Sequence, residues 1–139
     1  MARRYRPGIQ VQRDEILNSF YGFSDAPHVV YAVVQRFGRD RSPIYVGETS
    51  KPRKRFEQHL KVARGGRENR SAIGRRERGV VERGGALEFH ALEDCQDRIH
   101  VLAREAAWAR ALRRAGCNLA NTWPEHRAAA QSDKVPLSR

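Results

Sequence analysis

Three segments of the chain have the hydrophobic pattern of β-strands. Residues 28–34 (HVVYAVV) are mostly β-branched or aromatic, which is typical of a buried strand. The polar run 38–43 (GRDRSP) has the composition of a hairpin turn, and residues 44–46 resume the strand pattern. Apolar and polar residues alternate again over 86–92. The sequence therefore predicts an antiparallel hairpin and a third strand.

Other segments have the apolar spacing of amphipathic helices, namely 13–20, 52–64, 71–78 and 97–115. Pro52 stands in the first turn of the second helix, Asp97 is the expected N-cap of the last one, and Gly116 is expected to end it. This order of elements predicts a small α+β domain, in which a three-stranded antiparallel or mixed sheet is flanked by helices.

The length of 139 residues corresponds to one domain. We expect a helical extension at 1–27, the folded domain at 28–124 and a flexible tail at 125–139. The composition becomes polar after Trp123 and Pro124, which is the reason for placing the tail there.

Charge narrows the class of partner. The 27 Lys and Arg residues exceed the 16 Asp and Glu residues, so the formal net charge is +11. Residues 51–83 contain 12 basic and 4 acidic residues. Most of the basic residues are arginines, whose guanidinium forms two hydrogen bonds with a phosphate, although a GC-rich genome also raises arginine content. The pattern favours nucleic acid as partner, with expected contacts at Lys51, Arg53, Lys54, Arg75 and Arg76.

Several other classes are disfavoured. No run approaches the ~20 apolar residues that cross a bilayer, and the N-terminus lacks the apolar run of a signal peptide. We therefore expect a cytoplasmic protein with no membrane contact. Cys95 and Cys117 are too few for a disulfide scaffold, and a zinc site that joined them to His90 and His100 would lack closely spaced ligand pairs.

One carboxylate occupies an unusual position. Glu105 falls on the apolar face of the helix 97–115, between Leu102 and Trp108. Because removing a charge from water is costly, Glu105 requires a partner there, either one of the many arginines or a metal ion.

A second candidate group lies in the basic segment. Arg55 and His59 are four residues apart, so they share a helix face. They form either a solvated surface pair or a binding site for a phosphodiester. Tyr31 and Tyr45 lie on the two strands of the hairpin, where each is also suited to filling the core.

Taken in chain order, these residues resemble the motifs of the GIY-YIG nuclease superfamily. The run Tyr45-Val46-Gly47 matches the second signature, and Val29-Val30-Tyr31 stands where the family has Gly-Ile-Tyr. In YVGETSKPRKRFEQH, an arginine follows the second tyrosine by ten residues and a histidine follows four residues later, which are Arg55 and His59.

The resemblance continues to the end of the last helix. LAREAAWARAL resembles the helix that carries the family's metal-binding glutamate, which is Glu105 here, and GCNLAN resembles the segment with its asparagine, Asn118. The likeness extends from about Val29 to Asn121, with every motif in order.

The resemblance implies a divalent-metal-dependent DNA endonuclease that hydrolyses phosphodiester bonds. Glu105 would hold one Mg²⁺, with Mn²⁺ as a substitute. Tyr31 would be the general base for the attacking water, with its phenol pKa lowered by the cationic pocket, and Tyr45 would position water or phosphate.

The remaining motif residues would serve the phosphate. Arg55 would bind the scissile phosphate, and His59 would hydrogen-bond phosphate or assist proton transfer. Asn118 would tether the site, and Gly47 would let the backbone approach it closely.

Two positions depart from the family pattern. Val29 replaces the glycine of the first signature, and Glu48 stands where some members have a lysine that helps to deprotonate the nucleophile. The alternative function is a non-catalytic, basic nucleic-acid-binding protein that retains the fold. RNA stays open as a substrate. A homo-oligomer stays open as well, because one metal site cuts one strand at a time.

Overall fold

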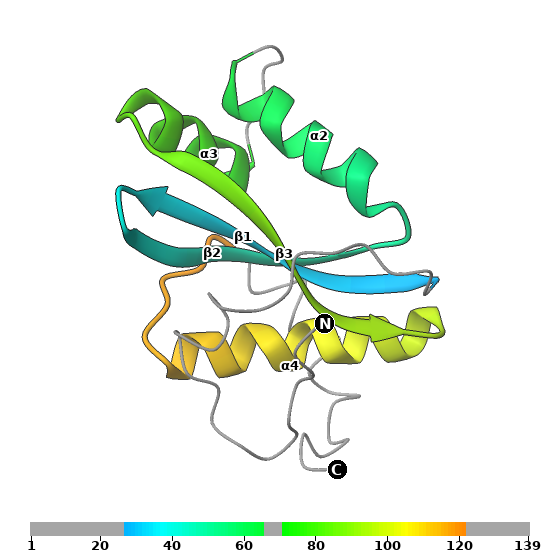
Figure 1. The fold of residues 1–139 in the computed structure, drawn as a ribbon. Helices are drawn as coiled ribbons and strands as arrows, with labels where there is room; N and C mark the ends of the chain where they lie inside the picture. Colours follow the sequence, from blue (N-terminus) through cyan, green and yellow to red (C-terminus); the bar gives the residue numbers. More distant parts are fainter. Residues whose placement is uncertain (1–26, 66–70, 122–139) are drawn as a thin grey trace.

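The computed structural model describes residues 27–65 and 71–121, which form three strands and three helices (Figure 1). In chain order the elements are β1 (His28–Phe37), β2 (Asp40–Thr49), α2 (Pro52–Ala63), α3 (Ala72–Glu82), β3 (Ala86–Cys95) and α4 (Arg98–Arg114). The expected helix at 13–20, and with it nearly all of the N-terminal extension, lies outside the described residues, as does the expected tail.

The three strands form one antiparallel sheet in the order β2-β1-β3. This confirms the predicted α+β class and the three-stranded sheet. β1 is central and β2 and β3 are edge strands, so the hairpin of β1 and β2 is extended by β3 on the other side. The apolar composition of β1 follows from this position, because a central strand is covered on both faces.

The hairpin is longer than predicted. β1 continues to Phe37 and β2 begins at Asp40, so the turn consists of Gly38 and Arg39 alone. Gly38 has a positive φ of 62°, a conformation that glycine adopts without strain. The polar run was predicted as turn, but it forms the start of an edge strand, where polar residues remain in contact with water and Pro43 is tolerated.

Each face of the sheet is covered by a different set of helices (Figure 1). Val30, Ala32 and Val34 of β1 pack in one apolar cluster with α4. Tyr31 and Val33 point to the other face, into a cluster with residues of α2 and α3. Alternation along one strand therefore gives the sheet two differently packed faces, with Tyr31 of β1 on the face covered by α2 and α3.

Local signals explain where the helices begin. The Ser71 hydroxyl accepts a hydrogen bond from the Gly74 amide at the start of α3, and Asp97 accepts one from His100 at the start of α4. Asp97 and Pro52 confirm the predicted starts of α4 and α2. α3 ends at Glu82, four residues beyond the predicted helix.

The segment after α4 runs along the open edge of β2. The Ala120 amide donates to the Ile44 carbonyl, at 2.7 Å. The buried side chain of Asn121 pairs with both backbone groups of Val46, accepting from its amide at 2.9 Å and donating to its carbonyl at 2.6 Å. Asn121 therefore acts like an additional strand residue and satisfies the edge of β2.

No helix among the described residues is long and apolar enough to cross a membrane.

We expect Asn121→Ala to lower the free energy of unfolding by about 1–3 kcal/mol, because it leaves the buried backbone groups of Val46 without their partner. The matched control is Asn118→Ala, since Asn118 is exposed in the same segment and should cost less than about 0.5 kcal/mol. Urea unfolding of both variants gives the comparison. Equal losses would contradict the role given to Asn121.

Candidate active site

Tyr31 is fully buried in the middle of the sheet, on the face covered by α2 and α3. Its ring stacks on Phe89 of β3, with ring centroids 4.4 Å apart. A hydroxyl at this depth requires a hydrogen-bond partner, because leaving it unpaired would cost free energy. The ring is fixed by packing, so the position of the hydroxyl is fixed as well.

The partner of that hydroxyl is His59 of α2. The Tyr31 Oη and His59 Nε2 atoms are 2.9 Å apart. On the other side of the imidazole, Nδ1 lies 2.5 Å from Oε2 of Glu77, which comes from α3 and is almost completely buried. Phenol, imidazole and carboxylate thus follow one another across three elements of the fold.

Gly47 makes room for the Tyr31 ring. The two residues are direct partners across β1 and β2. A Cβ atom at position 47 would lie 2.5 Å from the Tyr31 hydroxyl oxygen and 2.6 Å from the ring carbon that carries it. The glycine of the second signature is therefore required by a neighbouring side chain. The sequence had instead suggested close approach of the backbone to the site.

Burial raises the pKa of the Tyr31 phenol far above its ordinary value. The charges of Tyr45 and Glu105 raise it further, whereas the charge of Arg55 and a hydrogen bond from Arg55 lower it. The expectation of a lowered pKa was wrong, because desolvation outweighs the nearby guanidinium. Tyr31 is a neutral phenol over the physiological range, and a proton acceptor has to be at hand when it loses its proton.

Four of the predicted catalytic residues surround Tyr31. His59 and Arg55 interact with its hydroxyl from α2, and Glu105 of α4 acts on it through its charge. The Tyr45 ring of β2 lies 6.4 Å from that of Tyr31 and 5.9 Å from that of His59, between centroids. Residues separated by more than 70 positions in the chain are thus combined in one region. Their catalytic roles stay predictions.

Asn118 differs from these residues. It is exposed in the segment after α4, whereas Asn121, three residues later, is buried against β2. The tethering role that the sequence gave to Asn118 stays a prediction. The structure assigns a tether of the backbone to Asn121, which sequence reasoning did not single out.

A basic pocket opens beside Arg55, where the end of β2 meets the starts of β1, α2 and α4. Its volume is about 250 Å³, and its lining includes Lys51, Lys54, Arg55 and Arg98. Glu48 also lines it and pairs with Arg98, with 3.1 Å between Nη1 and Oε2. Positive charge exceeds negative charge in this pocket, so it suits an anionic ligand.

The other predicted nucleic-acid contacts lie on helix surfaces. Arg53 is exposed on α2 and Arg75 is exposed on α3. Arg76 is half-buried on α3, and its pKa is lowered by burial and by the neighbouring charge of Arg83. These helices share one face of the sheet (Figure 1), so their basic residues add positive charge to that side of the molecule.

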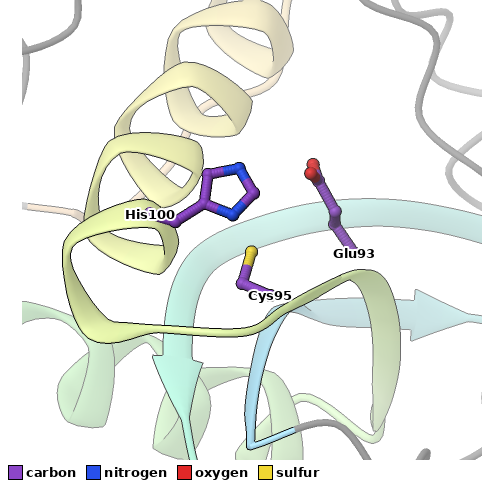
Figure 2. A group of neighbouring side chains, drawn as sticks. All are labelled: Glu93, Cys95 and His100. Atoms are coloured by element: carbon purple, nitrogen blue, oxygen red, sulfur yellow. The ribbon is translucent and has the colours of Figure 1, made fainter.

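A different group of potential metal ligands lies between β3 and the start of α4 (Figure 2). Donor atoms of Glu93, Cys95 and His100 lie within 4.8 Å of one another. Both Glu93 oxygens, however, accept hydrogen bonds from Arg104, and Oε1 also accepts one from Trp108. The half-buried carboxylate of Glu93 is thus already paired with a guanidinium.

Cys95 and His90 give no support to a zinc site either. Burial, with the charge of Glu93, raises the pKa of the Cys95 thiol to about 12, so the thiol carries its proton at neutral pH. His90, which the sequence had grouped with the cysteines, pairs with Glu88 at 3.0 Å.

Glu77 is the residue of the site that sequence reasoning missed. It stands in a run of arginines (RRERG), where a glutamate is expected to be a surface ion-pair partner. On α3, however, Glu77 falls on the same side as the buried residues Gly74 and Val80. That spacing of three was the available signal, since a charged residue on a buried helix face needs a specific partner.

The comparison with known families agrees with this geometry. Residues 27–118 match the family model of the GIY-YIG catalytic domain, and this match covers well over half of the chain. The chain therefore belongs to the GIY-YIG family, whose domain is a nuclease domain. Neither the curated proteins nor the solved structures contain a match.

We expect Gly47→Ala to destabilise the fold by about 1–3 kcal/mol, because the added methyl group overlaps the packed Tyr31 ring. The control is the same substitution in a Tyr31→Ala background, where the ring is absent and the extra cost should mostly disappear. Thermal or urea unfolding of the four proteins in this cycle gives the coupling. An unchanged cost in the Tyr31→Ala background would contradict the steric explanation.

The raised pKa of Tyr31 also predicts a loss of stability in alkali. The unfolded chain releases the phenol proton near the ordinary pKa of 10.0, whereas the folded protein retains it. The stabilisation is fully present below about pH 10 and is lost as the pH rises further. Between about pH 10 and pH 11, the wild type should lose about 1 kcal/mol more unfolding free energy than Tyr31→Phe. Parallel losses in urea titrations would contradict the shift.

Proposed function

We propose that this protein is a divalent-metal-dependent endonuclease that hydrolyses phosphodiester bonds in DNA. The observation that carries the proposal is the buried hydrogen bond between Tyr31 Oη and His59 Nε2, at 2.9 Å, beside the guanidinium of Arg55. A phenol linked to a proton acceptor and next to a phosphate-binding side chain has the composition of a site for phosphodiester hydrolysis.

Tyr31 would act on the attacking water. Its hydroxyl oxygen accepts a proton from water when its own proton has an acceptor, and His59 Nε2 is within hydrogen-bond reach. Because burial keeps the phenol neutral, a free phenolate is not available as the base. The water and the phenol would therefore be deprotonated together.

Arg55 would bind the scissile phosphate. It lines the basic pocket and also interacts with the Tyr31 hydroxyl, so it connects the phosphate-binding region to the proposed base. A guanidinium donates two parallel hydrogen bonds to phosphate oxygens and stabilises the charge that develops on them in the transition state. Lys51 and Lys54 of the same pocket would bind flanking phosphates of the nucleic acid.

Glu105 would hold the metal ion. Its carboxylate is half-buried on α4, and its charge acts on Tyr31, the residue placed next to the attacking water. Mg²⁺ binds to hard oxygen donors and requires only one or two carboxylates, with phosphate oxygens and water completing its shell, so this donor fits. A bound Mg²⁺ or Mn²⁺ would neutralise charge on the phosphate during the reaction.

Tyr45 would position water or phosphate, since its ring lies close to both Tyr31 and His59. DNA as the substrate follows from the family resemblance. The basic pocket recognises phosphates that DNA and RNA share, so the two nucleic acids are separated by experiment.

The test uses supercoiled plasmid DNA with the purified protein and Mg²⁺. We expect nicked or linear products in Mg²⁺ and none in excess EDTA, with activity restored by Mn²⁺. Glu105→Gln should lower the cleavage rate by at least about 10²-fold while DNA affinity changes little, because a lost ligand removes transition-state stabilisation.

The controls separate the alternatives. Arg64→Ala removes one exposed positive charge at the end of α2, outside the proposed site, and should leave the rate near that of the wild type. Cleavage of single-stranded RNA in place of plasmid would change the assigned substrate. Binding of plasmid without cleavage in either metal would instead identify a non-catalytic nucleic-acid-binding protein.

A further inference from the structure

Glu77 is a buried carboxylate that the GIY-YIG motifs do not include. It projects from α3 toward α2, and its side chain is 1% exposed. Its Oε2 atom lies 2.5 Å from Nδ1 of His59, while the opposite ring nitrogen lies 2.9 Å from the Tyr31 hydroxyl. Burial raises the pKa of the Glu77 carboxyl, while the hydrogen bond and charge of His59 act to lower it, so His59 is the partner that offsets the cost of burying this group.

We propose that Glu77 is a positioning residue that keeps the proton of His59 on Nδ1, so that Nε2 is free to accept the hydroxyl proton of Tyr31. This role rests on the proposed function, because it concerns the base that activates water for phosphodiester hydrolysis. It also makes a statement about the resting protein that is testable without any substrate.

The short contact between His59 and Glu77 allows two proton arrangements. The 2.5 Å between His59 Nδ1 and Glu77 Oε2 is within hydrogen-bond distance, and a neutral imidazole has one N–H to donate. With that proton on Nδ1 and a carboxylate at position 77, the lone pair of Nε2 points to Tyr31. The opposite arrangement has a protonated Glu77 that donates to Nδ1, and a Nε2–H group that donates to the Tyr31 oxygen.

The nearby charges favour the arrangement with the proton on His59 Nδ1 and a carboxylate at position 77. When His59 accepts a proton it becomes positive, and Arg55 on the same helix already carries a positive charge next to Tyr31. Other charged or titratable groups near the phenol are Tyr45 of β2 and Glu105 of α4. A carboxylate in contact with the imidazole offsets the second positive charge, which a neutral residue at position 77 would not do.

The proton and electron movements balance in this scheme. A lone pair of the water oxygen forms the new P–O bond while its proton passes to Tyr31 Oη and the phenol proton passes to His59 Nε2. The bond from phosphorus to the leaving oxygen breaks with its electron pair, and solvent protonates that oxygen. The imidazolium paired with Glu77 then returns its proton to solvent, which restores the resting state.

Two substitutions of Glu77 distinguish the effect of its hydrogen-bond-accepting oxygen from the effect of its negative charge. Glu77→Met has a similar volume and removes both, whereas Glu77→Gln retains an oxygen that accepts from Nδ1–H but carries no charge. Glu82→Gln neutralises an exposed carboxylate of the same helix and is the control. We expect kcat to fall by about 10²-fold in Glu77→Met and less in Glu77→Gln, with an unchanged affinity for DNA.

A merely structural role is excluded by a double substitution. In a His59→Ala background, Glu77→Met should cause no further loss of kcat, because Glu77 acts through the imidazole. A further loss as large as in the wild-type background would overturn the proposal.

The direct measurement is the tautomer of His59 by nitrogen NMR of the labelled ring. At neutral pH we expect the proton on Nδ1 in the wild type and in Glu77→Gln, and a shift toward Nε2–H in Glu77→Met. A wild-type ring with its proton on Nε2 would overturn the proposal. This readout remains valid if Glu77→Met fails to fold, since the wild type and Glu77→Gln suffice. It also remains valid if the wild type cleaves no nucleic acid, an outcome that would reject the proposed function alone.

Discussion

The buried hydroxyl of Tyr31 is the constraint on which the arrangement of this face depends. A phenol in the centre of a covered sheet cannot hydrogen-bond to bulk water, so the fold has to supply a partner. His59 of α2 is that partner, and its own ring nitrogen is met by Glu77 of α3. One polar group on the central strand is thereby met by one polar side chain from each of the two covering helices.

Packing around the phenol serves the same constraint. Phe89 stacks on the ring from one neighbouring strand, and Gly47 leaves the space that the ring occupies on the other. Because Phe89 and Gly47 both belong to strands of the sheet, the Tyr31 ring lies between two elements whose backbones are held by the sheet. A site built on strands and helices maintains its geometry more accurately than one built on loops.

The two faces of the sheet differ in the side chains that they carry. The face under α4 holds an apolar cluster, and Asn121 closes the free edge of β2 at the end of the described chain. The face under α2 and α3 carries the contacts that run from Tyr31 through His59 to Glu77. The basic pocket opens beside Arg55 of α2. β1 contributes to both faces through its alternating side chains, and Glu105 of α4 acts through its charge on Tyr31 of the opposite face.

The amino-acid sequence by itself determined most of the secondary-structure elements and the family of the domain. Some sequence signals affect only neighbouring residues, such as the apolar composition of β1, Pro52 and the N-cap Asp97. The elements that they define are therefore predictable from the sequence alone. The order of Tyr31, Tyr45, Arg55, His59 and Glu105 was likewise sufficient to indicate the family that the domain match confirms.

Tertiary structure decided the rest, because burial changes what a residue does. The polar start of β2 became a strand through its pairing with β1, and Glu77 became a partner of His59 through the packing of α3 on α2. Asn121 meets Val46 from 75 positions away. The pKa of Tyr31 rises although Arg55 is near, because desolvation by the whole fold outweighs one adjacent charge, and desolvation is set by residues that are distant in the sequence.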